Sequence, residues 1–360
     1  MKENKLEKVR GLSHNCGYND QREYIMKTKE KLSVKDIAEL AGTSVATVSR
    51  VLNQNGRFSR ETEERVMKIV EAYGYQPNQL ARGLRAKYTH IVGVLVPNLC
   101  QDFYASITMA VQRNLLEKGY MAVIGSSDEN AENTKKFIGF LKSRKVDGLI
   151  YIGNSDLEGI TDMPTVYIDR DPRDTMPDIK DKYAMIECDN IQGGYLAGKE
   201  LAEKGCKNIC LVSYPFKIST HRKRLEGFKK AMEEYQISFD DSHIFEIFDN
   251  EWDAGSKAMQ KVLDTHPETD GIFFISDYLA LSGLKYLNDH RIPVPAKMKI
   301  VGFDDIQSCL YTTPEMTTIR QPVDDMARIS VEHLIAIILD EDVEQKRLRL
   351  PVALVQRSTT

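Results

Sequence analysis

The chain has 360 residues, of which 42% are hydrophobic and 28% charged, and its formal net charge is −4. The length predicts two or three domains, and the composition excludes a disordered or fibrous chain. The sequence contains neither an apolar run long enough for a membrane helix nor the apolar core of a signal peptide. We therefore expect a cytoplasmic protein whose six scattered cysteines are free thiols.

The net charge hides an asymmetry along the chain. Residues 1–26 carry +1, residues 27–90 carry +5, and residues 91–360 carry −10. A basic head favours polyanions, because neutralising phosphates releases counterions. Charge alone leaves open whether this head binds nucleic acid or is an ordinary solvated surface.

The segment LSVKDIAELAGTSVATVSRVLN, which begins at Leu32, predicts two short helices. Ser33 and Ser44 are good N-cap residues, and apolar residues follow each at helical spacing. Gly42 interrupts the pattern, as expected for the turn of a helix-turn-helix unit. The second helix would present its N-terminal face to base edges and phosphates. The residues on that face are Val45, Ala46, Thr47, Ser49 and Arg50.

A third helix is predicted to begin at the N-cap Ser59 and to end near Gly74. Residues 27–76 would then form the helix-turn-helix domain, and residues 1–26 a disordered extension. Residues 77–89 can form one short helix, too short to be stable alone. We interpret this segment as a hinge that orders on binding, and we expect deletion of residues 1–25 to leave DNA binding intact.

After Tyr88 the pattern changes to apolar runs that alternate with amphipathic helices, which is typical of buried parallel strands. Two consecutive sets of four runs predict an α/β body of two lobes, each a doubly wound parallel sheet. The runs are Ile91–Pro97, Met121–Ser127, Val146–Gly153, Thr165–Asp169, Asn208–Tyr214, His243–Phe248, Gly271–Ser276 and Lys299–Phe303.

Polar and aromatic side chains follow several of these runs. Because open parallel sheets bind ligands at the carboxyl ends of their strands, these side chains would face a cleft. They include Asp102, Phe103, Tyr104, Ser126, Ser127, Asp169, Arg170, Ser276, Asp277, Asp304 and Asp305. Aromatics, hydroxyls and carboxylates suit a small polyhydroxyl or heterocyclic ligand.

Motifs for enzymatic chemistry are missing from the sequence. GxGxxG after a strand, GxxxxGK[ST], GxSxG and HExxH do not occur. Cys206 and Cys210 have no second Cys/His pair nearby, which disfavours a zinc site. We therefore expect no catalytic residues, no metal and no cofactor.

These features together resemble the lactose-repressor (LacI/GalR) family of bacterial transcription regulators. The resemblance begins with VKDIAELAGTSVATVSRVLN and continues through VDGLI, RLEGF, VGFDD and TTPEMTTIRQP to the terminal QRSTT. It implies a dimer that binds pseudo-palindromic operator DNA and has a body of the periplasmic-binding-protein type. The body would span residues 90–360, with lobe one at 90–189 and 322–347 and lobe two at 190–321 and 348–360.

The resemblance also implies roles for individual residues of the head and hinge. Val45, Ala46 and Arg50 match base-reading positions, where apolar side chains contact thymine methyls and arginine contacts guanine. Leu84 matches a hinge leucine that wedges into the minor groove and kinks DNA. An apolar contact between hinge and body is its alternative reading. The full set of implied DNA contacts is Ser44, Val45, Ala46, Thr47, Ser49, Arg50, Asn53, Asn78, Ala81 and Leu84.

In the body, seven residues match positions that contact the small-molecule effector in the family. They are Phe103, Tyr104, Asp169, Arg224, Trp252, Ser276 and Asp304. Each also has an ordinary structural reading, such as core packing for Phe103 and Trp252 or a solvated ion pair for Arg224. Ser276 stands where sugar-responsive members often carry Asn. The chain has no C-terminal heptad tail, so a homodimer is expected.

The sequence therefore predicts a DNA-binding regulator, most simply a repressor, controlled by a sugar or sugar derivative. A purine or a phosphoprotein co-regulator remains an alternative controlling partner. A transport-type solute-binding protein is another alternative, which the basic head and missing signal peptide oppose. An enzyme on the same scaffold is the third, because fold alone does not define function.

Overall fold

The computed structural model describes residues 32–75, 88–153, 163–172, 183–248 and 251–360. The chain divides into a head, residues 1–87, and a body, residues 88–360, and each is described by itself. In the described part, no helix has the length and apolar character needed to cross a membrane. The expected extension and most of the expected hinge, with Asn78, Ala81 and Leu84, lie outside the described residues.

The described part of the head, residues 32–75, contains three helices, α3 (Val34–Leu40), α4 (Val45–Asn53) and α5 (Arg60–Ala72). Each begins where the sequence predicts it, at an N-cap serine whose hydroxyl accepts a hydrogen bond from a backbone N–H one turn on. Ser33 and Asp36 form a complete capping box. The caps satisfy amide groups that would otherwise lack partners, so they determine where these short helices start.

The three helices enclose one small apolar core. Its fully buried members include Ile37, Val48 and Val66, one from each helix. Gly42, in the turn between α3 and α4, has a φ of +62°, which a side chain would disfavour. The helix-turn-helix prediction is therefore confirmed as a local fold.

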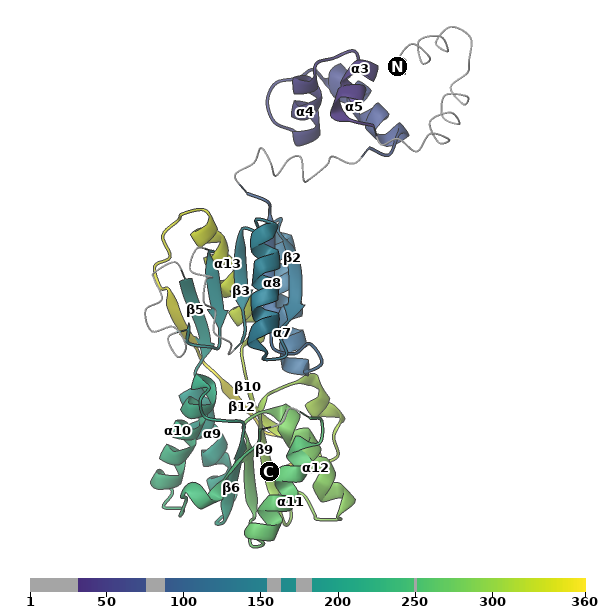
Figure 1. Ribbon diagram of the computed structural model, residues 1–360. Coiled ribbons are helices and arrows are strands. Elements are labelled where there is room, and N and C mark those ends of the chain that lie inside the picture. Colours follow the sequence, from purple (N-terminus) through teal and green to yellow (C-terminus); the bar gives the residue numbers. More distant parts are fainter. Residues whose placement is uncertain (1–31, 76–87, 154–162, 173–182, 249–250) are drawn as a thin grey trace. The chain divides into compact units, whose positions relative to one another are not determined.

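The body contains two six-stranded sheets with helices on their faces (Figure 1). The first has the order β11-β5-β4-β3-β1-β2, and the second β12-β10-β9-β8-β6-β7. All pairs are parallel except β10 with β12. The strands of the first sheet are β1 (Ile91–Val96), β2 (Met121–Ser126), β3 (Gly148–Tyr151), β4 (Thr165–Ile168), β5 (Tyr183–Cys188) and β11 (Arg347–Leu350). Those of the second are β6 (Ile209–Ser213), β7 (Ile244–Glu246), β8 (Gly271–Phe274), β9 (Lys299–Asp304), β10 (Thr317–Arg320) and β12 (Ala353–Val355).

Helices connect the strands within each lobe. The long helices of lobe one are α7 (Asp102–Glu117), α8 (Ala131–Ser143) and α13 (Val323–Ile338). Those of lobe two are α9 (Asn190–Glu203), α10 (Ser219–Glu234), α11 (Ala254–Thr265) and α12 (Asp277–Asp289), with short 3-10 turns η2 (Asp241–His243) and η3 (Gln307–Tyr311). Strand–helix alternation places the helix N-termini at the carboxyl edges of both sheets.

The eight predicted strands are all present, but four further strands were not predicted. They are β5, β10, β11 and β12. β11 has the sequence RLRL and is an edge strand with alternately exposed residues, so it lacks the continuous apolar pattern of the inner strands. β11 also corrects a boundary, because it pairs with β5 in the first sheet, so residues 348–350 belong to lobe one rather than lobe two.

Two glycines let α9 and α10 pack with their backbones in contact. A Cβ atom at Gly194 would lie 1.9 Å from the Arg224 carbonyl oxygen, and one at Gly227 would lie 1.8 Å from the Ile191 carbonyl oxygen. Both distances are far shorter than any van der Waals contact, and backbone atoms cannot yield as a side-chain tip can. This close approach determines where α10 presents its side chains.

We expect Gly227→Ala to lower the free energy of unfolding by roughly 1–3 kcal/mol, because the added methyl must push two helices apart. Urea denaturation followed by circular dichroism measures this loss. Gly139→Ala is the matched control, since Gly139 lies on α8 and a methyl added there would meet no atom within 4 Å. That control should be neutral or slightly stabilising. Equal effects of the two substitutions would contradict the packing argument.

Candidate functional site

The exposed face of α4 carries the residues that the sequence assigned to DNA. Val45 is 44% exposed, and Ala46, Ser49 and Arg50 are also exposed. Thr47 is half-buried, and its hydroxyl lies 2.9 Å from that of Ser44. Asn53 ends the helix. The core side of α4 is used by Val48 and Val51, so the exposed face is available for a ligand.

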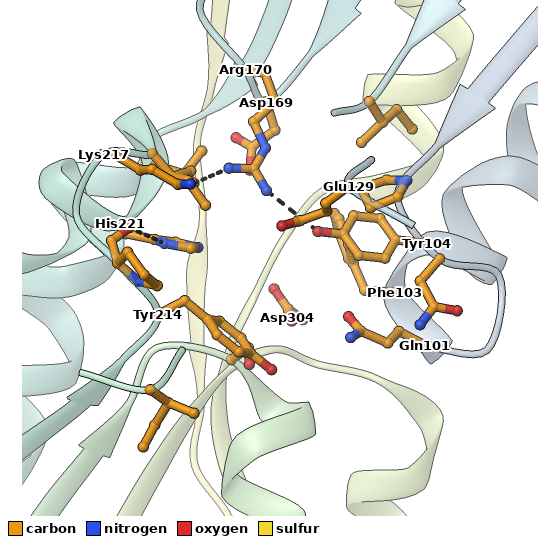
Figure 2. A pocket seen from close by; sticks show the side chains of 18 of the residues that line it. Gln101, Phe103, Tyr104, Glu129, Asp169, Arg170, Tyr214, Lys217, His221 and Asp304 are labelled. Atoms are coloured by element: carbon orange, nitrogen blue, oxygen red, sulfur yellow. Dashed lines mark hydrogen bonds between the residues drawn. The ribbon is translucent and has the colours of Figure 1, made fainter. Parts of the chain in front are cut away.

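A cavity of about 450 Å³ opens between the carboxyl edges of the two sheets of the body (Figure 2). Both lobes contribute to its walls, as the rule for open parallel sheets predicts. Six of the seven residues assigned to the effector line it. They are Phe103, Tyr104, Asp169, Arg224, Ser276 and Asp304.

Arg224 of α10 is the most connected side chain at this site and is only 5% exposed. Its Nε donates to Asn190 Oδ1 at 2.8 Å, and its Nη1 donates to the Ile275 carbonyl at 2.7 Å. Its guanidinium also lies 3.5 Å from the ring centroid of Phe303. These contacts hold the charged plane in one orientation, which excludes the reading of Arg224 as a solvated surface residue.

Two buried carboxylates flank Arg224, one from each lobe. Asp169, just beyond β4, lies 3.5 Å from Nη2, and Asp304, at the end of β9, lies 3.8 Å from Nη1. Asn190 completes the group, because its amide donates to Asp169 Oδ1 at 2.8 Å while its oxygen accepts from Arg224. Asp169 and Asp304 have φ angles of +56° and +123°, so the backbone is strained where the carboxylates are aimed.

Burial dominates the electrostatics of Asp304. Together with the smaller effect of the Asp277 charge, it raises the pKa of Asp304 to about 8 despite the opposing effect of Arg224. Gln321 Nε2 donates to Asp304 Oδ1 at 2.7 Å. Burial likewise raises the pKa of Asp277 to about 6, although Thr318 and the Ile306 N–H both donate to it. Asp304 therefore changes protonation near neutral pH.

Several residues of the cavity wall were not assigned from the sequence. They include Gln101, Asp128, Glu129, Tyr214, Lys217, Thr220 and His221. Arg170, which also lines the cavity, was predicted to face the cleft as a strand-end residue but was not assigned to the effector. The strand-end rule that found Asp169 also applied to four residues that follow β6, namely Tyr214, Lys217, Thr220 and His221. The segment KISTHRKR carried this signal, but only Arg224 was predicted from it.

Trp252 does not line the cavity in this structure. It is 69% exposed and precedes α11, whereas the wall nearest it in sequence is formed by Ile247 and Phe248. Its exposure excludes the alternative of ordinary core packing. Its stacking on the effector stays a prediction.

The fold and the two sites define a class of protein, a helix-turn-helix DNA-binding head joined to a two-lobed periplasmic-binding-like body. A family model for bacterial regulatory proteins of the lacI family matches residues 33–78, and a periplasmic binding protein-like domain matches residues 199–360. The ribose operon repressor of Halalkalibacterium halodurans is 32% identical over 332 residues, 91% of this chain and 97% of that protein. The chain therefore belongs to the lacI family of DNA-binding transcription regulators.

Two solved structures extend the similarity over both domains. The lac repressor dimer bound to operator and the anti-inducer ONPF has a TM-score of 0.80 and 26% identity, covering 92% of this chain and 99% of that one. The transcriptional regulator CelR in complex with cellobiose has a TM-score of 0.68 and 27% identity, covering 92% of this chain and all of that one. The predicted fold class is thereby confirmed.

The raised pKa of Asp304 predicts a pH-dependent stability. Between about pH 4 and pH 8 the folded protein binds more protons at this carboxyl than the unfolded chain does, so stability falls as the pH rises. The slope from one such group is at most about 1.4 kcal/mol per pH unit. Asp304→Asn should therefore become more stable relative to the unmodified protein as the pH increases from 5 to 8.

Urea titrations at several pH values measure this difference. Asp289→Asn is the matched control, because Asp289 is an exposed residue of α12 paired with Lys285. The control should track the unmodified protein across the range. If Asp304→Asn tracked it as well, the Asp304 carboxyl would be ionised throughout and the assigned cause would be wrong.

Proposed function

We propose that this chain is a homodimeric repressor that binds pseudo-palindromic operator DNA through α4 and responds to a small ligand held between its lobes. The observation that carries the proposal is the exposed face of α4, where Val45, Ala46, Ser49 and Arg50 are solvent-accessible, within a segment, residues 27–90, of net charge +5. A docked recognition helix needs this combination of small side chains for close approach and one long donor.

The chemistry of these residues assigns each a part in base reading. Val45 and Ala46 would contact thymine methyl groups, and Arg50 would donate two hydrogen bonds to the O6 and N7 of guanine. The hydroxyls of Ser44 and Thr47 lie at the helix N-terminus, where phosphate oxygens are favoured by the dipole and by free N–H groups. Asn53, and the hinge residues Asn78, Ala81 and Leu84, complete the proposed DNA contacts.

The dimer supplies the two-fold symmetry that a pseudo-palindromic operator requires. The solved lac repressor neighbour is such a dimer on operator DNA. Because each half-site is read by one head, doubling the contacts multiplies specificity without enlarging either domain.

The cavity supports a sugar-class effector for this chain. Carboxylates, an amide and hydroxyls converge on a space of about 450 Å³ beside the aromatic rings of Phe103 and Tyr104. Carboxylates accept from sugar hydroxyls, and aromatic faces cover the apolar face of a sugar ring. The cellobiose complex of CelR shows that this fold accepts a saccharide. A purine is the alternative effector, and a phosphoprotein co-regulator the alternative partner.

Ligand binding would act on DNA affinity by selecting one angle between the lobes. Contacts already cross the cleft, since Arg224 of lobe two meets Asp169 of lobe one and the Ser308 hydroxyl donates to Asp102. A ligand that replaces or completes these contacts has different affinities for the open and closed arrangements, which is the condition for coupling.

We expect Arg50→Ala to weaken operator binding by about 1–3 kcal/mol and to relax base preference at one position of each half-site. Gel shifts of the full-length protein on its own promoter DNA and on random DNA, over a range of salt concentrations, measure both effects. Random-sequence binding should change much less, because it depends on phosphate charge.

Arg65→Ala is the matched control, because it removes an exposed arginine of α5 that pairs with Glu61. It should leave the ratio of operator to random affinity unchanged. An Arg50→Ala protein with the original ratio would exclude α4 as the base-reading element.

A further inference from the structure

The cavity contains a buried positive charge that the Arg224 network does not neutralise. Arg170 is 8% exposed, yet among the residues that the structure describes no carboxylate lies within ion-pair distance of its guanidinium. Its hydrogen bonds are two long ones, both 3.4 Å, to the hydroxyls of Thr220 and Tyr104. A guanidinium has five N–H donors, so most of its donor capacity is unused.

Burying a cation without an anionic partner is costly, so such a group normally marks the place of a ligand charge. Figure 2 shows Arg170 between Lys217 and His221 on one side and Tyr104 and Glu129 on the other. The two hydroxyls that accept from Arg170 keep their own protons. Both can therefore donate to an oxygen atom placed beside the guanidinium.

The first turn of α10 adds a second, independent feature to the same wall. Lys217, Ile218, Thr220 and His221 all line the cavity, and α10 has no side-chain N-cap. The positive end of a 16-residue helix, with free N–H groups, thus faces the region beside Arg170.

His221 also lies in the positive electrostatic potential around Arg170. Burial lowers the pKa of His221 well below its usual value, and the next causes are the charges of Arg170 and Arg224. The ring Nδ1 lies 3.2 Å from the Pro215 carbonyl, an acceptor that requires a proton on Nδ1. Lys217 is exposed at the rim and has no ion-pair partner in the described residues.

The carboxylates that line the cavity either lie beside Arg224 instead of Arg170 or are exposed to water. Asp169 and Asp304 flank Arg224. Asp128 and Glu129 are exposed, and the Asp128 carboxylate accepts from the Ser126 hydroxyl. Because water screens exposed charges far more than buried ones, these two acids compensate Arg170 weakly. They remain suitable acceptors for ligand hydroxyls.

We propose that the effector carries an oxyanion, as a phosphate ester or a carboxylate on a small polyhydroxyl body, and that Arg170 and the first turn of α10 bind it. This inference rests on the proposed ligand-binding function of the cavity and narrows the ligand to an acidic sugar. The hydroxyls of the same ligand would meet the carboxylates near Arg224, so the two halves of the cavity would read different parts of one molecule.

The first experiment uses inorganic phosphate as the probe and the melting temperature of the full chain as the readout, at constant ionic strength. A ligand that binds only the folded state raises this temperature. Phosphate should raise it for the unmodified protein and for Lys230→Gln, which removes a charge from α10 outside the cavity. The rise should be reduced in Arg170→Gln.

Phosphate also stabilises proteins generally by exclusion from their surface, so the difference between variants is the measured quantity. Equal shifts in all three proteins would show a nonspecific salt effect and overturn the proposal. If Arg170→Gln is too unstable to compare, Thr220→Val keeps the shape of the wall and removes one hydroxyl. It should reduce the shift in the same way, and an unchanged shift in this variant would also overturn the proposal.

The second experiment identifies the source of the charge by calorimetry with three matched ligands: a neutral hexose, its phosphate ester and its uronic acid. One of the two acidic forms should bind more tightly than the neutral sugar. Arg170→Gln should weaken that form roughly 10- to 100-fold and leave the neutral sugar unaffected. Neutral sugar binding as tightly as both acids would overturn the proposal, while operator binding, measured separately on DNA, would still test the proposed function.

Discussion

The ion-pair group around Arg224 is the interaction on which the cavity depends. One guanidinium reaches the ends of β4, β8 and β9 and the start of α9, through Asp169, Ile275, Asp304 and Asn190. Removing Arg224 would leave the buried carboxyl groups of Asp169 and Asp304 without their cation, a larger loss than one surface ion pair. The group therefore defines the arrangement of both lobes at the cleft.

Arg224 can occupy this position only because α9 and α10 touch at their backbones. Gly194 faces the Arg224 carbonyl, and Gly227 faces the Ile191 carbonyl. With larger residues at either position, α10 would move away from α9, and the bond between Arg224 and Asn190 would lengthen beyond hydrogen-bonding distance. The position of Arg224 in the cavity therefore depends on the close packing of α9 against α10.

Sequence reasoning predicted the elements with strong local signals. Serine caps and helical spacing located α3, α4 and α5, and apolar runs located eight strands, including the edge strands β2 and β7. β11 has the alternating sequence RLRL and β12 is only three residues long, and each pairs at a sheet edge with a strand that is distant in the sequence. No local pattern encodes which distant strand they accept as a partner.

The residues of the candidate site likewise divide into those that a local sequence pattern predicted and those that no local pattern predicted. Phe103, Tyr104, Asp169, Arg224, Ser276 and Asp304 follow strands or stand in a family motif, and all six line the cavity. Arg170 was predicted to face the cleft but not to contact the ligand, and His221 was missed because a basic segment such as KISTHRKR usually forms a solvated helix face. Only burial distinguishes them, and burial results from the fold as a whole.

Charge acts in two different physical regimes in this protein. The basic residues in the described part of the head, residues 32–75, are exposed, so their attraction to phosphates is long-range, sequence-independent and weakened by salt. Arg170 and Arg224 are buried, where screening is weak and each charge requires a partner at a defined distance and angle. The net charge of −4 therefore does not predict the function, because the acidic body encloses two buried cations, Arg170 and Arg224, that an average over the chain hides.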